Sequence, residues 1–216
     1  MNEMKETSKV ICIDPKNIEK SKIISVVSYL KEGKVVAFPT DTVYGLGADI
    51  EDEMAVRRIF YIKNRSFNKP LMLLISNIDE VSKLAKDISS SIYKLINKYW
   101  PGPLTIILKA RRKIFGITSD DQKIALRVPD SKIALTLIKE FGKPITAPSA
   151  NLSGEENLIT AEEVKKELGD KVDLIVDGGQ CKHRKPSTII DLSCAKPILL
   201  REGSISFMDI MSVYEG

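Results

Sequence analysis

The stretch FPTDTVYGLG, residues 38–47, decides how the rest of the chain is interpreted. It continues the apolar run 35–38, which predicts a buried strand that Pro39 ends. The turn contains two threonines around an aspartate, and two glycines follow soon after. A simple change of chain direction does not need so many polar and flexible residues. Gly45 and Gly47 permit tight backbone paths close to a ligand. We therefore expect a binding turn, while capping of the turn by its own threonines and aspartate is the alternative.

Helix and strand patterns alternate on both sides of this turn and predict one α/β domain over residues 1–216. Apolar residues at helical spacing indicate the helices, and continuously apolar strands are typical of a sheet covered by helices. The predicted helices are 17–33, 51–64, 78–86, 88–99, 131–142, 161–169 and 206–214; the predicted strands are 34–38, 71–75, 104–109, 123–128, 144–150, 173–178, 187–191 and 197–201.

Composition limits the class of protein. The net charge of +4, from 33 basic and 29 acidic residues, is too mild to indicate a nucleic-acid partner by itself. No apolar run approaches the ~20 residues of a membrane span, and the polar N-terminus has no secretory signal pattern. Three scattered cysteines predict free thiols in a reducing compartment, so we expect a cytoplasmic protein that does not bind a membrane.

The single histidine, His183, limits the chemistry further. A multi-histidine metal site is excluded, and a Ser-His-Asp mechanism would have to use this one residue. No acidic cluster has metal-ligand spacing, so no protein metal site is predicted. Basic clusters at 109–113 and 182–185 are interpreted as solvated loops, with an RNA or a nucleotide phosphate as the alternative. An enzyme with these residues works by positioning and charge stabilisation.

Lys63 and Arg65 lie at the end of the predicted helix 51–64. Residues two positions apart do not share a helix face, but an extended K-x-R segment can aim both cations at one anion. A cationic helix end that the helix dipole favours is the alternative.

Other polar groups lie at the ends of later strands. Ser149 and Asn151 offer a hydroxyl and an amide in a loop after a strand, where open α/β sheets bind ligands; a hydrogen-bonded polar turn is the alternative. Arg127 ends an apolar strand and, if buried, needs an anionic partner. Ser187 and Arg201 lie on late strands. Together these groups predict a site for a polar anion, such as a nucleotide phosphate or a carboxylate.

Eight segments, in order, resemble the YrdC-like threonylcarbamoyl-AMP synthase family. The likeness covers roughly residues 20–205 and implies a YrdC-like fold, with a twisted mixed β-sheet flanked by helices, in its short single-domain form. The segments are FPTDTVYGLGA (38–48), KNR with KPL (63–71), WPGPLT (100–105), LRVPD (126–130), APSANLSG (147–154), DGG (177–179), STIID (187–191) and LLREG (199–203).

The resemblance implies a nucleotidyltransferase that makes L-threonylcarbamoyl-AMP and pyrophosphate from L-threonine, bicarbonate and ATP, with Mg²⁺. Other enzymes would then transfer the threonylcarbamoyl group to tRNA, which this chain would meet directly or through those proteins. The implied roles are Lys63 and Arg65 as catalytic residues on the ATP phosphates; Thr118, Ser149, Asn151 and Arg201 as further ATP-binding residues; and Thr40, Arg127 and Ser187 as L-threonine-binding residues.

Three positions depart from the family pattern. Ser66 stands where proline usually follows K-x-R, and Glu202 stands where LRPG is common. Leu74 occupies a position where some members have a substrate-contacting histidine.

Two other functions remain open from the residues. A binding module for double-stranded RNA or tRNA would use the two basic clusters and would bind RNA in a salt-sensitive way without turning over ATP. A relative that adenylates another carbamate would release pyrophosphate with carbamoyl phosphate instead of threonine.

Overall fold

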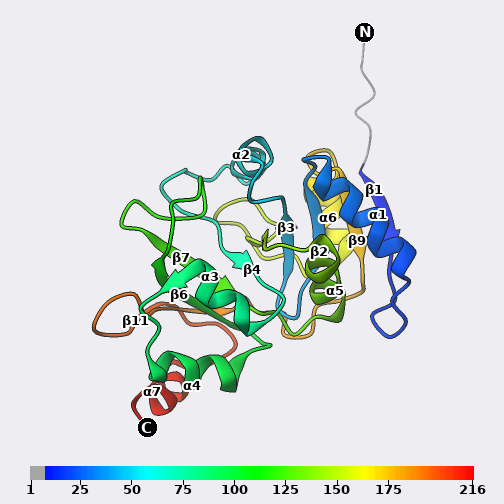
Figure 1. Cartoon of the computed structure of the whole chain (residues 1–216). Helices are drawn as coiled ribbons and strands as arrows, with labels where there is room; N and C mark the ends of the chain where they lie inside the picture. Colours follow the sequence, from blue (N-terminus) through cyan, green and yellow to red (C-terminus); the bar gives the residue numbers. More distant parts are fainter. Residues whose placement is uncertain (1–7) are drawn as a thin grey trace.

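A computed structural model describes residues 8–216, so part of the N-terminal stretch used above lies outside the described residues. Strands and helices alternate along most of this chain (Figure 1). The strands are β1 Lys9–Cys12, β2 Val36–Pro39, β3 Tyr44–Gly47, β4 Leu73–Leu74, β5 Ala85–Lys86, β6 Leu104–Ala110, β7 Lys123–Arg127, β8 Ile145–Thr146, β9 Leu174–Asp177, β10 Thr188–Asp191 and β11 Ile198–Arg201. The helices are α1 Lys20–Lys31, α2 Glu53–Ile62, the 3₁₀ helix η1 Ile78–Glu80, α3 Val81–Leu84, α4 Ser90–Tyr99, α5 Lys132–Phe141, α6 Ala161–Leu168 and α7 Phe207–Glu215.

The strands form two mixed sheets. The first has the order β1-β9-β2-β3, in which β2 runs parallel to β9 and antiparallel to β3. The second has the order β11-β10-β6-β7-β4-β8, with β5 paired to β6. In Figure 1 the first sheet lies on the right with α1, α5 and α6, and the second lies on the left with α3, α4 and α7. The predicted α/β class, with mixed sheet flanked by helices, is confirmed, but the strands form two sheets where one was predicted.

Strand β2 is buried on both faces because helices cover the first sheet from both sides. Val36 and Phe38 face a core cluster built with α1 and α5, while Val35 and Ala37 face a second cluster that includes α6. Alternate residues of a strand point to opposite faces, so the continuous apolar run 35–38 fits a strand with a core on each side.

Backbone pairing between β3 and the segment 145–150 joins the two sheets. Leu46 donates its N–H to the carbonyl of Pro148, and Ala150 donates to the carbonyl of Tyr44, both within 2.9 Å. The buried hydroxyl of Thr146 adds a side-chain link, because it accepts from the N–H of Ala48 and donates to the carbonyl of Leu46, each at 2.9 Å. The two sheets are therefore tied together directly beside the stretch 38–47.

Several predicted elements were wrong in extent or kind. The predicted strands 71–75 and 144–150 reduce to β4 and β8, two residues each, and the predicted helix 78–86 ends at Leu84. Pro39 is the last residue of β2 instead of lying outside it, because it pairs with Tyr44 of β3. The pattern also missed β1 and β3, which form the two edges of the first sheet, and β5, which pairs with β6.

The glycines of the opening stretch were partly misinterpreted. Gly45 and Gly47 lie in β3, where the backbone needs no left-handed conformation. A β-carbon on Gly47 would come within 2.9 Å of Cε1 of Phe38. This glycine therefore lets the Phe38 ring pack directly on β3, while Gly45 lines the cavity described below.

Candidate functional site

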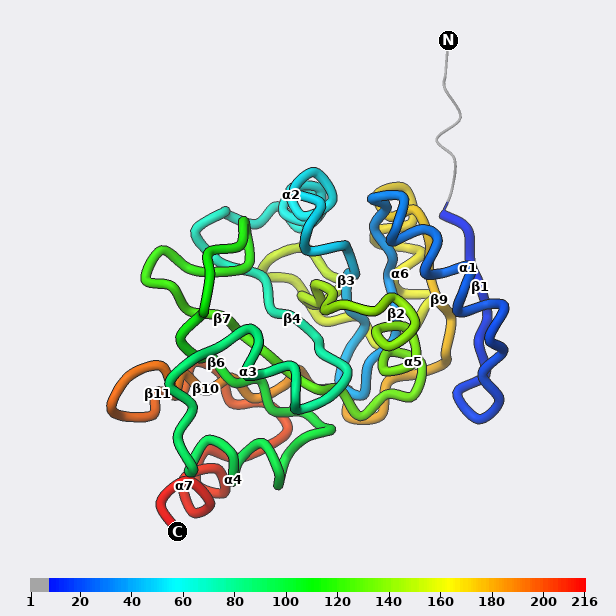
Figure 2. The backbone as a smooth tube through the Cα atoms, in the orientation of Figure 1, coloured from blue at the N-terminus to red at the C-terminus, as the bar shows by residue number. Residues whose placement is uncertain are grey.

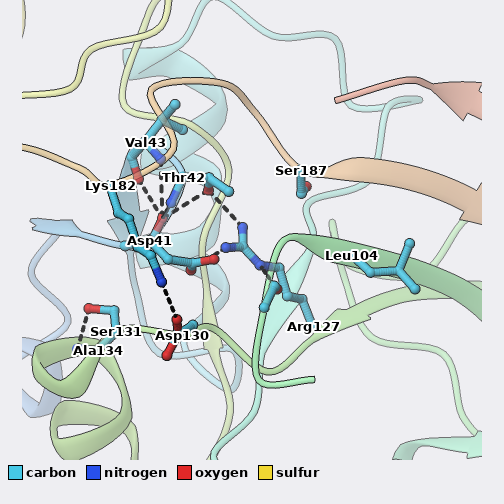
Figure 3. A network of polar contacts seen from close by, with 12 residues as sticks. Asp41, Thr42, Val43, Leu104, Arg127, Asp130, Ser131, Ala134, Lys182 and Ser187 are labelled. Carbon is cyan, nitrogen blue, oxygen red and sulfur yellow. Dashed lines mark hydrogen bonds and ion pairs between the residues drawn. The ribbon is translucent and has the colours of Figure 1, made fainter. Parts of the chain in front are cut away.

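Arg127, the last residue of β7, is the centre of a buried polar network (Figure 3). Its guanidinium donates to the carboxylate of Asp41, to the hydroxyl of Thr42 at 2.8 Å and to the carbonyl of Gly102 at 2.9 Å. The Arg127 side chain is 3% exposed and that of Asp41 is fully buried. Burial lowers the pKa of Arg127, and the charge of Asp41 opposes that shift. The anionic partner expected for a buried arginine is thus supplied by the stretch 38–47.

Thr40 directs its hydroxyl into its own turn. The Oγ1 atom donates to the carbonyl of Val43 at 2.7 Å and accepts from the backbone N–H groups of Thr42 and Val43. It also lies 3.0 Å from Oγ1 of Thr42, whose hydroxyl receives a hydrogen bond from Arg127. Thr40 therefore caps its own turn, as the alternative interpretation expected. Thr40 and Thr42 also lie in the wall of a cavity.

Ser187 lies immediately before β10 and lines the same cavity as Arg127 (Figure 3). Its hydroxyl is 2.8 Å from Oγ1 of Thr105 and accepts a hydrogen bond of 3.2 Å from Arg201. Arg201 also donates from Nε to the carbonyl of Ser187 at 3.0 Å. Ser187 and Arg201 are thus hydrogen-bonded to each other at the end of the second sheet where β10 pairs with β11.

Lys63 caps the C-terminus of α2 and is 2% exposed. Its ammonium donates to the carbonyls of Ser149 and Asn151 at 2.5 and 2.7 Å, and to Oδ1 of Asn151 at 3.1 Å. Ser149 donates to the same Oδ1, and Asn151 donates from Nδ2 to the carbonyl of Glu155 at 2.6 Å. The structure therefore brings K-x-R and S-x-N together, with Lys63 holding the loop 149–151 in shape.

Burial lowers the pKa of Lys63 to about 7, and repulsion from Arg65 acts in the same direction. The three oxygen atoms that accept from Nζ act in the opposite direction, because a hydrogen bond from the charged form favours that form. Lys63 therefore loses its proton more readily than an exposed lysine does.

Arg65 lies in the loop after α2 and is bound by that loop. Its Nε donates to the carbonyl of Lys69 at 2.7 Å, and its NH2 group donates to the carbonyl of Pro70 at 3.0 Å. Thr118 lies nearby in the loop 114–118, where its hydroxyl is bound to the backbone of Ile114. The two loops meet through a hydrogen bond of 2.8 Å from Leu71 to Gly116.

Cations gather at this end of the two sheets with little compensating charge. Repulsion from Arg127 and Arg65 adds to burial in lowering the pKa of Arg201. Arg127 has the carboxylate of Asp41 as its partner. Within residues 8–216, no ion pair joins Lys63, Arg65 or Arg201 to a carboxylate. Such a cluster favours an anionic ligand, because an anion relieves the mutual repulsion.

A narrow cavity lies beside Arg127 and reaches Ser149. Hydroxyl and guanidinium groups form part of its wall, and Leu74 on β4 adds an apolar side chain. Its lining includes Thr40, Thr42, Leu74, Arg127, Ser149 and Ser187. Hydroxyl, guanidinium and apolar groups therefore meet in one small enclosed space.

The loop 178–186 lies over the stretch 38–47 and carries one of the basic clusters. His183 donates its backbone N–H to the carbonyl of Asp41 at 2.9 Å, and Lys182 forms an exposed ion pair with Asp130 at 3.0 Å (Figure 3). Tyr44 donates its hydroxyl to the carbonyl of Gly179 at 3.0 Å. The only histidine of the chain thus contributes its backbone to this site.

Sequence reasoning missed two partners in this site. Asp41 was interpreted only as a possible turn cap, although its place between two threonines at the end of a buried strand was a signal for a buried charge. Thr105 was hidden inside an apolar strand, and it is fully buried against Ser187. The departure at Glu202 also has a local reason, because its carboxylate accepts the backbone N–H of Phe207 at the start of α7 at 2.9 Å.

The described part of the chain, residues 8–216, contains no group of three or more His, Cys, Asp or Glu side chains that could hold a metal ion. The same residues contain no helix that is both long and apolar enough to cross a membrane.

Residues 28–203 match the family model of Sua5, YciO and YrdC proteins, which is described as telomere recombination. The chain is 42% identical over 203 residues to a putative threonylcarbamoyl-AMP synthase of Methanocaldococcus jannaschii, covering 92% of this chain and 94% of that protein. It is 41% identical over 197 residues to a threonylcarbamoyl-AMP synthase of Pyrococcus abyssi, covering 91% of this chain but 58% of that longer protein. The crystal structure of P. abyssi Sua5 complexed with L-threonine has a TM-score of 0.90 and 39% identity, over 95% of this chain and 61% of that one.

Proposed function

Because the chain belongs to the Sua5/YciO/YrdC family, we propose that it forms L-threonylcarbamoyl-AMP and pyrophosphate from L-threonine, bicarbonate and ATP. The observation that carries this proposal is that the structure brings the buried Arg127 close to the K-x-R and S-x-N residues: Arg127 and Ser149 line one narrow cavity, and Lys63 donates to the carbonyl of Ser149. The product would serve the formation of threonylcarbamoyladenosine in tRNA. The free cysteines of the chain support a location of the protein in the cytoplasm.

The threonine half of the site would use Arg127, Thr40 and Ser187. A guanidinium has five N–H groups, and three protein partners receive hydrogen bonds from that of Arg127. Its remaining N–H groups would bind the carboxylate of threonine. The hydroxyls at 40 and 187 would contact the amino-acid side chain, and Leu74 would contact its methyl group.

The nucleotide half would use Lys63, Arg65 and Arg201, with Thr118, Ser149 and Asn151 as further contacts. The cations would neutralise the phosphates and stabilise the charge that develops on the leaving pyrophosphate. Lys63 already donates to three oxygens of the loop 149–151, so its role includes positioning that loop. Effects of this kind depend on fixed geometry and not on a histidine base.

The reaction would proceed in two steps. The amine of threonine loses a proton and forms a C–N bond with carbon dioxide, which bicarbonate releases together with hydroxide. The resulting carbamate oxygen attacks the α-phosphorus of ATP, a P–O bond to it forms, and the bond from the α-phosphorus to the bridging oxygen of pyrophosphate breaks. The residues of the chain would align the carbamate with the α-phosphate and keep both anions together against their repulsion.

Mg²⁺ does not fit a site made by side chains in residues 8–216, because no cluster of suitable ligands is present there. We propose that any Mg²⁺ enters on the ATP phosphates, which commonly supply most of its ligands together with water. None of the steps above is assigned to the metal.

The test is pyrophosphate release from ATP and bicarbonate with single amino acids. We expect release with L-threonine and much less with L-valine, which has the same shape without the hydroxyl. Release with carbamoyl phosphate but not with threonine would assign the chain to another carbamate. Salt-sensitive RNA binding without any pyrophosphate release would contradict the enzyme proposal in favour of a binding module.

A further inference from the structure

Thr105 is a polar residue inside the apolar strand β6. Its neighbours Leu104, Ile106 and Leu108 belong to one hydrophobic core cluster, and alternate residues of a strand point to opposite faces. Thr105 therefore points away from that cluster. In the second sheet β6 lies between β10 and β7 (Figure 2), so these two strands flank the residue on either side.

The register of β6 places Thr105 next to two residues of the candidate site. The antiparallel ladder with β7 includes the pair Ile106–Leu126; Thr105 directly precedes Ile106, and Arg127 directly follows Leu126. On the other side lies β10, the strand that Ser187 precedes. The Thr105 side chain is fully buried, and its Oγ1 atom lies 2.8 Å from Oγ of Ser187.

The available hydrogen-bond partners set the direction of this contact. Within residues 8–216, Ser187 is the only partner of the Thr105 hydroxyl. If Ser187 donated to Thr105, the hydroxyl hydrogen of Thr105 would be buried without an acceptor, which is unfavourable. Thr105 is therefore the donor of the hydrogen bond, and the oxygen of Ser187 accepts it.

This direction determines what Ser187 offers to a ligand. A hydroxyl group has one hydrogen and two acceptor lone pairs. The oxygen of Ser187 accepts from Thr105 and, at 3.2 Å, from Arg201, so both of its acceptor positions are filled. Its own hydrogen has no acceptor among the described residues, and Ser187 lines the narrow cavity. That hydrogen is thus available to an oxygen atom in the cavity.

We propose that Thr105 is a positioning residue that makes Ser187 a hydrogen-bond donor to bound L-threonine. Thr105 is not among the described residues of the cavity wall, so it acts through Ser187. The ligand atom at this position is a carboxylate or hydroxyl oxygen, because an ammonium group only donates. The inference rests on the proposed function, since it takes L-threonine as the ligand.

The test is the binding of L-threonine and, separately, of ATP to the whole protein, measured by calorimetry. Thr105→Val removes the hydroxyl with little change of shape. It should weaken L-threonine binding by roughly 2- to 10-fold, the range expected for loss of one neutral hydrogen bond. Thr105→Ser keeps a hydroxyl at this position and should retain the affinity. ATP affinity should stay unchanged in both variants.

Further variants show whether Thr105 acts through Ser187. Ser187→Ala should weaken L-threonine binding, and adding Thr105→Val to it should cause no further loss, because the hydroxyl that Thr105 orients is then gone. Thr188→Val is the matched control. Thr188 is also fully buried, but its hydroxyl binds only the backbone of Gly203 and Ile205, so this variant should keep the L-threonine affinity.

Three results would overturn the inference. Equal or tighter L-threonine binding in Thr105→Val would mean that Ser187 donates to Thr105 and that the substitution frees its hydrogen for the ligand. A further loss in the double variant would mean that Thr105 does not act through Ser187. An equal loss in Thr188→Val would reveal a general effect of packing at this end of the sheet.

The inference and the proposed function fail separately. Normal L-threonine binding in Thr105→Val, together with threonine-dependent pyrophosphate release, overturns the inference alone. L-Threonine binding that depends on Thr105 without threonine-dependent release overturns the proposed function and supports the role of Thr105. Absence of any L-threonine binding to the unsubstituted protein overturns both.

Discussion

Arg127 and Asp41 form the most deeply buried ion pair in the described part of the chain. Both side chains are buried, and the second carboxylate oxygen of Asp41 has no hydrogen-bond partner within the described chain. Removing one member of such a pair leaves an uncompensated charge in a medium that solvates it poorly. The pair therefore fixes the guanidinium against the stretch 38–47, and the loss of either member should destabilise the fold.

Arg127→Met should lower the free energy of unfolding by about 3–5 kcal/mol, because it leaves the Asp41 charge buried and unpaired. Chemical denaturation measures this value. The matched control is Lys182→Met, which breaks the exposed ion pair with Asp130 in the same region and should cost about 0–1 kcal/mol. Similar small losses in the two variants would contradict a stabilising role of the buried pair.

Lys63 supplies a prediction on pH. Its folded pKa of about 7 lies below the ordinary 10.5, so between these values the unfolded chain binds more protons than the folded one. The contribution of Lys63 to stability therefore rises as the pH increases from about 7 toward 10.5. The difference in unfolding free energy between the protein and Lys63→Met should grow over this range in favour of the protein. A flat difference would mean that the three oxygen acceptors keep Lys63 protonated throughout.

At the scale of elements, the decisive contact is the one between β3 and the segment 145–150. It connects the first sheet, which carries residues 40–42 at its edge, to the second sheet, which carries Arg127. Because β4 and β8 are each only two residues long, side-chain hydrogen bonds supplement the ladder here. The hydroxyl of Thr146 is the clearest example, with one hydrogen bond donated and one accepted across the junction.

Thr146→Val tests this junction. Valine has a similar shape but leaves the N–H of Ala48 without its buried acceptor, so we expect a loss of about 1–3 kcal/mol of unfolding free energy. Thr136→Val on α5 is the control, since its hydroxyl binds the carbonyl of Lys132 at an exposed position and should cost little. Equal effects of the two substitutions in chemical denaturation would contradict a special role for Thr146.

At the scale of the whole molecule, the candidate site lies where the two sheets meet. The proposed threonine half draws on the stretch 38–47, on β7 and on the residue before β10, while the proposed nucleotide half draws on the end of α2 and on the loop 147–154 (Figure 1). A ligand in this cavity would contact both sheets at once. Its binding free energy should therefore stabilise the molecule as one cooperative unit.

Ligand binding should raise the melting temperature. A ligand at 100 times its Kd adds about 2.7 kcal/mol to the stability of a protein that binds it only when folded. We expect an increase with ATP and with L-threonine in thermal denaturation, and a single transition in each case. D-Threonine has the same composition with the wrong arrangement around the α-carbon and serves as the control. An equal increase with both enantiomers would argue against a specific threonine site.

The sequence by itself determined the fold class and the chemical character of the site. Apolar periodicity is a local property, so it predicted most helices, and the order of polar motifs indicated a family. The sequence missed β1 and β5 and predicted β4 and β8 too long, because their pairing partners lie elsewhere in the chain and local preferences do not encode the pairing. The prediction of one domain over residues 1–216, and each predicted ligand role, stays a prediction.

Only the tertiary structure decided which polar groups share a partner. Asp41 and Arg127 are 86 positions apart, and Lys63 reaches across 88 positions to Asn151. These contacts exist because strand pairing brings distant segments to one edge of the sheets, and no local pattern specifies that pairing. The residue types of FPTDTVYGLG thus predicted a polar turn, in which Thr40 forms the cap. Long-range packing made Asp41 the counter-ion of Arg127.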